Sequence, residues 1–145
     1  MEAPWLDRLC AVYESYREKA TAVVKNRKPG QGLFGLGRQP ADDPCHDAFV
    51  EELERLLSDF AASGPESAAV RGVLDHVYHW PTAHRKPPSM YWMLIAVHGL
   101  TLDLIPLLGR EDAAALRTQY AADYPRWERL PVQKCVLAAL EAGEQ

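Results

Sequence analysis

The sequence predicts an all-α fold: one domain over residues 1–145, built as a bundle of five or six mostly antiparallel helices. Apolar residues recur every three or four positions through several long stretches, which is the spacing of one face of a helix. No stretch of four to eight residues alternates between apolar and polar as a half-buried strand does. Proline, glycine and serine divide the chain into segments of helical length.

A glycine-rich stretch separates the first two predicted helices. The first is expected from Pro4 to about Arg27, because proline suits the first turn of a helix and Pro29 cannot continue this one. The second is expected to start at Asp43, a capping residue, with Pro44 at its first position. The stripes predicted to face the core are Trp5, Leu9, Val12, Tyr16, Ala20 and Val23, followed by Phe49, Leu53, Leu56 and Phe60.

The third helix is predicted to start at a capping box formed by residues 63–66 (SGPE). In such a box the Ser63 hydroxyl accepts a hydrogen bond from the Glu66 amide, and the Glu66 side chain reaches back. Pro81 is expected to end the helix, because proline has no amide hydrogen to donate. The predicted buried face consists of Val70, Val73, Val77 and Trp80.

The fourth helix is predicted over residues 90–108 as the apolar centre of the bundle, with Ser89 as its cap and Gly109 at its end. Its length approaches the 20 residues that cross a bilayer. However, it contains His98 and Asp103, and a charged residue inside a membrane is unfavourable by roughly 2.5 to 3.5 kcal/mol. We therefore expect a buried core helix and no membrane partner.

The two polar residues of this segment have different expected surroundings. His98 shares a face with apolar residues, where a histidine usually makes a structural hydrogen bond. Asp103 lies on another face and, if buried, would need a cation such as Arg71 or Arg117. The sequence assigns neither residue a role.

Two shorter helices complete the prediction. The fifth is expected from about Glu111 to Asp123, and Pro131 opens the sixth. Their inward-facing residues are predicted to be Ala113, Leu116 and Tyr120, followed by Val132, Val136, Ala139 and Leu140.

Composition and cysteine content indicate a globular cytoplasmic protein. Hydrophobic residues make up 48% and charged residues 25% of the chain, which is ordinary for a folded domain. The net charge of −4 argues against a nucleic-acid-binding protein. Cys10, Cys45 and Cys135 are odd in number and lack a repeated spacing, so reduced thiols are expected. The opening residues, MEAPWLDRLC, contain no apolar leader.

Gly30, Gly32 and Gly35 match the G-x-G-x-x-G spacing of dinucleotide-binding loops. In those loops the first glycine follows a β-strand, and the pyrophosphate lies at the amino end of the next helix. Here the glycines follow a predicted helix that ends in VVKNRKPG. We interpret them as a turn and not as a nucleotide site.

The longer connections between helices are basic. If successive helices alternate in direction, the connections at 25–43, 80–88 and 124–130 share one end of the bundle. Together they contain eight basic and three acidic residues, a net charge of +5, which leaves −9 for the rest of the chain. Arginine and tryptophan are common in binding surfaces, although cations at helix C-termini can also simply offset the helix dipole.

This basic, aromatic end predicts a non-enzymatic binding protein that needs no cofactor and engages an acidic protein surface or an anionic small ligand. A homodimer with Trp80 or Trp127 at its interface is also possible. The residues predicted to contact the partner are Lys28, Arg38, Trp80, His84, Arg85, Lys86, Arg126, Trp127 and Arg129.

An alternative prediction is a metal-binding protein or a metal-dependent enzyme. His76 and His79 are neighbours on one flank of a helix, with Asp75 or His84 as a third ligand. The spacing differs from the HExxH motif of metalloproteases, in which the histidines stand four residues apart. This site would require the imidazoles to converge on one point.

Overall fold

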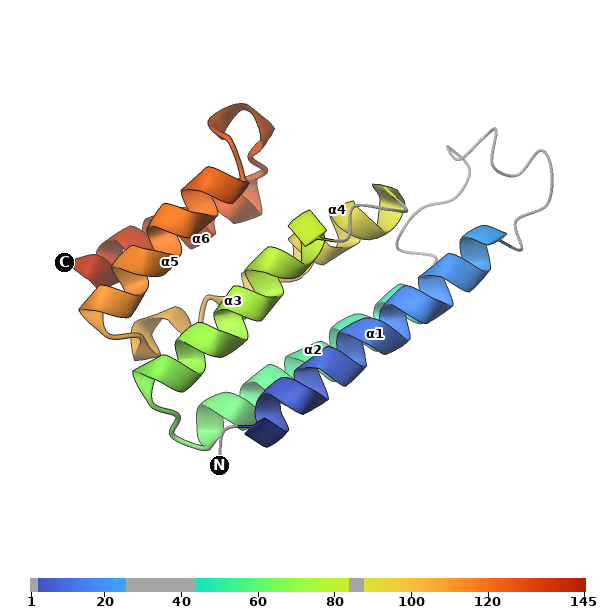
Figure 1. Ribbon diagram of the computed structural model, residues 1–145, viewed down its shortest axis with the longest axis horizontal. Helices are drawn as coiled ribbons and strands as arrows, with labels where there is room; N and C mark the ends of the chain where they lie inside the picture. Colours follow the sequence, from blue (N-terminus) through green and yellow to red (C-terminus); the bar gives the residue numbers. More distant parts are fainter. Residues whose placement is uncertain (1–2, 26–43, 84–87) are drawn as a thin grey trace.

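The computed structural model describes residues 3–25, 44–83 and 88–145, and all regular structure in these ranges is helical (Figure 1). The all-α prediction is therefore confirmed. The α-helices are α1 (Ala3–Lys25), α2 (Pro44–Ala62), α3 (Ser67–Ala83), α4 (Pro88–Ala96), α5 (Arg110–Asp123) and α6 (Pro131–Glu144). Short 3-10 helices are η3 (Val97–Thr101), η4 (Ile105–Leu107) and η5 (Arg126–Glu128).

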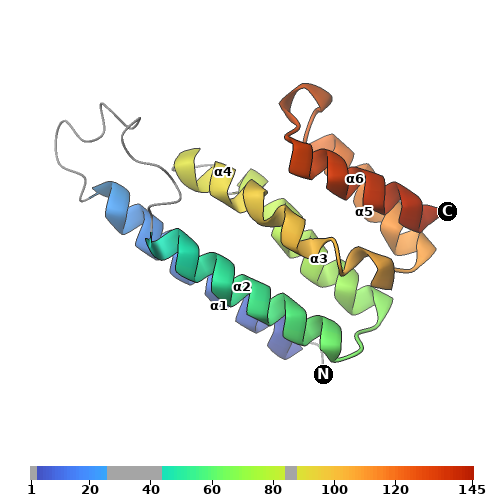
Figure 2. The same ribbon diagram turned by 180° about the vertical axis from the view of Figure 1, so that it is seen from behind.

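The α-helices pair into three antiparallel hairpins, α1–α2, α3–α4 and α5–α6, which stand side by side (Figure 1). Helices α1, α3 and α5 form one layer, and α2, α4 and α6 form the layer behind it (Figure 2). The middle hairpin contacts both neighbours: α3 packs on α1 and α5, and η3 packs on α2 and α6. The apolar segment expected at the centre of the bundle therefore does lie between flanking helices.

Aromatic side chains pack together within and between the hairpins in a common core. Trp5 of α1 meets Phe60 of α2 edge to face, with ring centroids 5.5 Å apart. Tyr78 of α3 meets Tyr120 of α5 in the same way at 4.9 Å. Such pairs add to the free energy gained by burying the rings, so they hold neighbouring helices at a defined separation.

The two tight connections lie at one end of the stack, where a polar cluster links α3 to α5. The Ser67 hydroxyl accepts from the Gly109 amide at 2.7 Å and donates to the Asp112 carboxylate at 2.5 Å. Arg71 donates to the same carboxylate at 3.0 Å. The Ser67 hydroxyl and Arg71 together hold the pKa of Asp112 below its usual value.

The predicted capping box at residues 63–66 is not formed. The Ser63 hydroxyl donates to the carbonyl of Phe60 at 2.6 Å and so closes the end of α2. Gly64 then turns the chain with a φ of 69°, a conformation that glycine adopts without strain. Helix α3 begins at Ser67, and the Glu66 carbonyl accepts from the amide of Val70.

Helix α3 continues past Pro81, which the sequence analysis expected to end it. A proline at this position removes the amide that would bond the Val77 carbonyl. The buried His98 ring lies near that carbonyl, but its Nε2 atom makes no hydrogen bond among the described residues. The Tyr124 hydroxyl donates to the next carbonyl, that of Tyr78. A tertiary partner thus satisfies one of the carbonyls at the end of the helix.

The expected single helix over residues 90–108 is divided into α4, η3 and η4. Two local features explain the division. The Thr101 hydroxyl donates to the His98 carbonyl at 2.7 Å, and a 3-10-type bond joins Leu104 to Thr101. Pro106, which has no amide hydrogen, then enters η4. Within the described ranges, no helix has both the length and the apolar character needed to cross a bilayer.

Candidate functional site

The connection between α5 and α6, residues 124–130, is a turn held firmly at its base. Tyr124 is fully buried, and its hydroxyl donates to the Tyr78 carbonyl of α3. Arg129 Nε donates to the Tyr124 carbonyl at 2.9 Å, which caps the end of α5. The Leu130 amide donates to Gln133 Oε1 at 2.8 Å and fixes the start of α6. We call this segment the α5–α6 turn.

The tip of the α5–α6 turn presents an indole and a guanidinium to solvent. Trp127 is 84% exposed, whereas Trp92, another solvent-facing tryptophan, is 45% exposed. Arg126 beside it is also exposed. Because the base of the turn is hydrogen-bonded into the fold, this exposure belongs to a fixed element. Tryptophan and arginine are both enriched among the residues that dominate binding energy in interfaces.

The structure also shows where the other helix ends of the predicted binding surface lie. The last turns of α1 and α3, the first turns of α2 and α4, and the α5–α6 turn are at the same end of the stack (Figure 1). The predicted contact residues Lys28, Arg38, His84, Arg85 and Lys86 lie outside the described residues.

Two predicted contact residues have roles within the fold. Trp80 is partly buried and packs against Tyr13 and His76, with ring centroids 5.4 and 5.3 Å apart. Arg129 is directed back to the end of α5 through its bond to Tyr124. Arg126 and Trp127 are therefore the described members of the predicted set that face solvent.

Trp92 is an exposed aromatic residue that the sequence analysis missed. It lies on α4 with its ring centroid 5.1 Å from that of Tyr91, which is buried. The segment 90–108 is apolar on nearly every side, so periodicity assigned none of its faces to solvent.

His76 and His79 point to different neighbours. The His76 ring lies 5.1 Å from that of Tyr13, and its Nδ1 atom is 3.9 Å from Cys10 Sγ of α1. His79 is exposed and lies near Asp123 of α5. Burial raises the pKa of the Asp123 carboxyl, and the nearby histidine opposes this rise. In the described part of the chain, no group of three His, Cys, Asp or Glu side chains is arranged to hold a metal.

His98 lies in a buried polar cluster of the core. Its Nδ1 atom is 2.8 Å from the Tyr120 hydroxyl, and the Tyr78 hydroxyl is 2.6 Å from that of Thr101. Burial lowers the pKa of His98 to about 3, against the smaller opposing effect of the nearby Val77 carbonyl. The ring is fully buried and therefore neutral at pH 7. The cluster ties α3, η3 and α5 together.

Asp103 is exposed, so it needs no buried counter-ion. The two arginines considered as its partners make other contacts. Arg71 bonds Asp112, and Arg117 forms an ion pair with Glu144 near the end of α6. The aspartate is thus a surface group on the back layer of the stack.

Tyr13 of α1 carries a buried hydroxyl whose effect on stability can be measured. Its side chain is fully buried, its hydroxyl has no hydrogen-bond partner among the described residues, and burial raises its pKa. An unsatisfied buried hydroxyl costs about 1–3 kcal/mol. We expect Tyr13→Phe to leave stability unchanged or to raise it by about 1 kcal/mol, measured by urea denaturation. A loss of more than about 1 kcal/mol would show that the hydroxyl has a partner.

Comparisons with protein-family models, with curated proteins and with solved structures find no match to this chain. Its function is therefore inferred from the chemistry of its own surface.

Proposed function

We propose that this protein is a non-enzymatic binding protein that engages an acidic surface of a partner protein through the α5–α6 turn and the neighbouring basic connections. The observation that supports this most directly is Trp127, 84% exposed beside Arg126 on a turn whose base is fixed. Leaving a large apolar ring in water is unfavourable, and burying it against a partner regains that free energy. A fixed turn also loses little conformational entropy on binding.

Charge favours an acidic partner. The three long connections carry a net charge of +5 in a chain whose net charge is −4. Positive charge on a binding surface speeds association with an acidic partner and disfavours basic ones. A small anionic ligand is the weaker candidate, because small molecules are usually bound in concave sites and Trp127 protrudes. Free thiols at Cys10 and Cys135 are consistent with a reducing compartment such as the cytoplasm.

The metal-binding alternative receives less support. His76 packs toward α1 while His79 lies near Asp123 of α5, so the two imidazoles do not converge with a third ligand in the described residues. We therefore retain the binding protein as the proposed function.

Affinity capture with the immobilised protein tests the proposal. We expect wild type to retain a set of acidic proteins from a lysate of its source cells at 50 mM NaCl, identified by quantitative mass spectrometry. Trp127→Ala and Arg126→Glu should each reduce this retention about tenfold, since residues of this kind often contribute more than 1 kcal/mol. Retention should also fall at 300 mM NaCl because the charges are screened.

Leu107→Ala is the matched control. Leu107 is an exposed apolar residue, 41% accessible, in η4. The chain between α4 and α5, which contains η4, reaches the end of the stack opposite the α5–α6 turn (Figure 1). This variant should retain the same proteins as wild type. Equal retention by wild type, Trp127→Ala and Arg126→Glu would contradict the proposal. Light scattering on the same proteins would reveal a homodimer, which would make the partner a second copy of the chain.

A further inference from the structure

A groove lies on the back layer between α2 and η3, away from the α5–α6 turn. Its cavity volume is about 380 Å³, within the range of sites that accept side chains or small molecules. Leu57 and Leu104 are buried in its floor, and Ala61 and Leu100 are partly exposed there. The floor is therefore apolar, and part of it is accessible.

The walls of this groove are acidic. Glu54 stands on the α2 side and Asp103 on the η3 side, and both are exposed. A cationic side chain inserted between these walls would meet a carboxylate from each. Asp103, to which the sequence assigned no role, therefore supplies one of the two carboxylates that line this groove.

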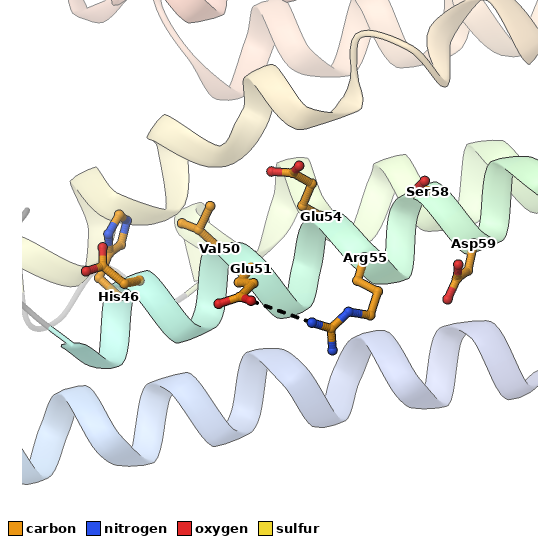
Figure 3. A pocket seen from close by; sticks show the side chains of 8 residues that line it. His46, Val50, Glu51, Glu54, Arg55, Ser58 and Asp59 are labelled. Atoms are coloured by element: carbon orange, nitrogen blue, oxygen red, sulfur yellow. Dashed lines mark ion pairs between the residues drawn. The ribbon is translucent and has the colours of Figure 1, made fainter.

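The groove continues along α2 into a second, more open hollow of about 530 Å³ that shares Glu54 and Ser58 with it. In Figure 3, Glu54 and Ser58 point toward the middle hairpin, while Arg55 points toward α1. Arg55 pairs with Glu51 at 3.6 Å. Asp47 and Asp59 also line this hollow, so its surface has more acidic than basic groups.

We infer that this groove is a docking site for a basic amphipathic segment of a second partner protein. Apolar side chains of the segment would cover Leu100 and Ala61, and its lysines or arginines would pair with Glu54 and Asp103. Charge complementarity selects this occupant, because Glu54 and Asp103 would repel an acidic segment and would gain no electrostatic attraction from a neutral one. The inference does not depend on the proposed role of Trp127, since the two surfaces have opposite charge and lie on different hairpins.

A labelled 14-residue helical peptide of leucine and lysine, with leucines on one face, is the probe. Fluorescence anisotropy at 50 mM NaCl should show saturable binding to the wild-type protein. The double variant Glu54→Gln/Asp103→Asn should weaken binding about tenfold, because it removes both carboxylates of the groove. Leu100→Lys should weaken it similarly by disrupting the apolar floor. Trp127→Ala should bind the peptide as wild type does.

The matched control is Glu111→Gln/Glu141→Gln, which removes two exposed carboxylates from α5 and α6 and changes net charge equally. It should alter the dissociation constant less than about twofold. A peptide with serine in place of leucine should bind more weakly, and one with glutamate in place of lysine should not bind.

Equal weakening by control and groove variants, or equal binding of the serine peptide, would overturn the inference in favour of unspecific charge attraction. Circular dichroism melting of each variant excludes unfolding as the cause of any loss. If wild type self-associates in light scattering and the groove variant is monomeric, the occupant is a second copy, and a separate basic partner is excluded.

Discussion

Lowering the pH from 7 to 4 is expected to destabilise this protein by on the order of 3 kcal/mol through His98 alone. The His98 ring is fully buried in the core, and desolvation lowers its pKa from 6.5 to about 3. The rings of Tyr78, Tyr120 and Tyr124 surround it, with centroids 5.1 to 5.6 Å away. Burial raises the pKa of Tyr78 and of Tyr120, so these phenols stay neutral across this range.

The direction of the effect follows from which state binds the proton. In the unfolded chain His98 takes up a proton below pH 6.5, whereas in the folded protein it remains neutral down to about pH 3. The folded state is therefore not penalised by His98 above pH 6.5, and the free energy of unfolding falls progressively as the pH is lowered from 6.5 toward 3.

The measurement is urea denaturation of wild type and His98→Asn between pH 4 and pH 8. The asparagine variant keeps a polar group near the Tyr120 hydroxyl but cannot titrate. We expect it to be less stable than wild type at pH 7, and the difference should shrink steadily below pH 6.5. A difference between wild type and His98→Asn that is constant with pH would show that His98 titrates normally in the folded state.

Truncation of Tyr124 is expected to produce the other large effect. Tyr124→Ala should reduce stability by about 4 kcal/mol, because it leaves a cavity where a fully buried aromatic ring had been. It also removes the bond from the hydroxyl to the Tyr78 carbonyl, which holds the α5–α6 turn against α3. Urea denaturation gives the change in free energy, and amide hydrogen exchange of residues 124–130 gives the mobility of the turn.

Tyr124→Phe separates the two contributions. It keeps the ring and should lose only about 1–2 kcal/mol, the cost of leaving a buried carbonyl without its donor. We expect amide exchange in the turn to be faster in Tyr124→Ala than in Tyr124→Phe. If both variants lose the same free energy, the hydrogen bond and not packing dominates at this position.

Much of the candidate site was predictable, because a turn between two amphipathic helices must lie at the surface. Pro131 and the stripe of α5 placed the 124–130 connection correctly, and the exposure of Arg126 and Trp127 follows from that position. The partial burial of Trp80 agrees with its place on the predicted inward face of the third helix, although its partners Tyr13 and His76 depend on where α1 packs.

The sequence by itself determined the all-α class, the starts of α2 and α6 and the extent of α5, because periodicity and proline act within one or two helical turns. Only the tertiary structure decided how α3 ends and how the 90–108 segment divides into shorter helices. It also decided which carbonyls accept hydrogen bonds from the Ser63 hydroxyl and the Arg129 guanidinium. The physical reason is the same in each case. A backbone carbonyl or a polar side chain has several possible partners, and the partner it obtains depends on which distant residue packs beside it. At the Tyr78 carbonyl that residue is Tyr124, which belongs to the α5–α6 turn.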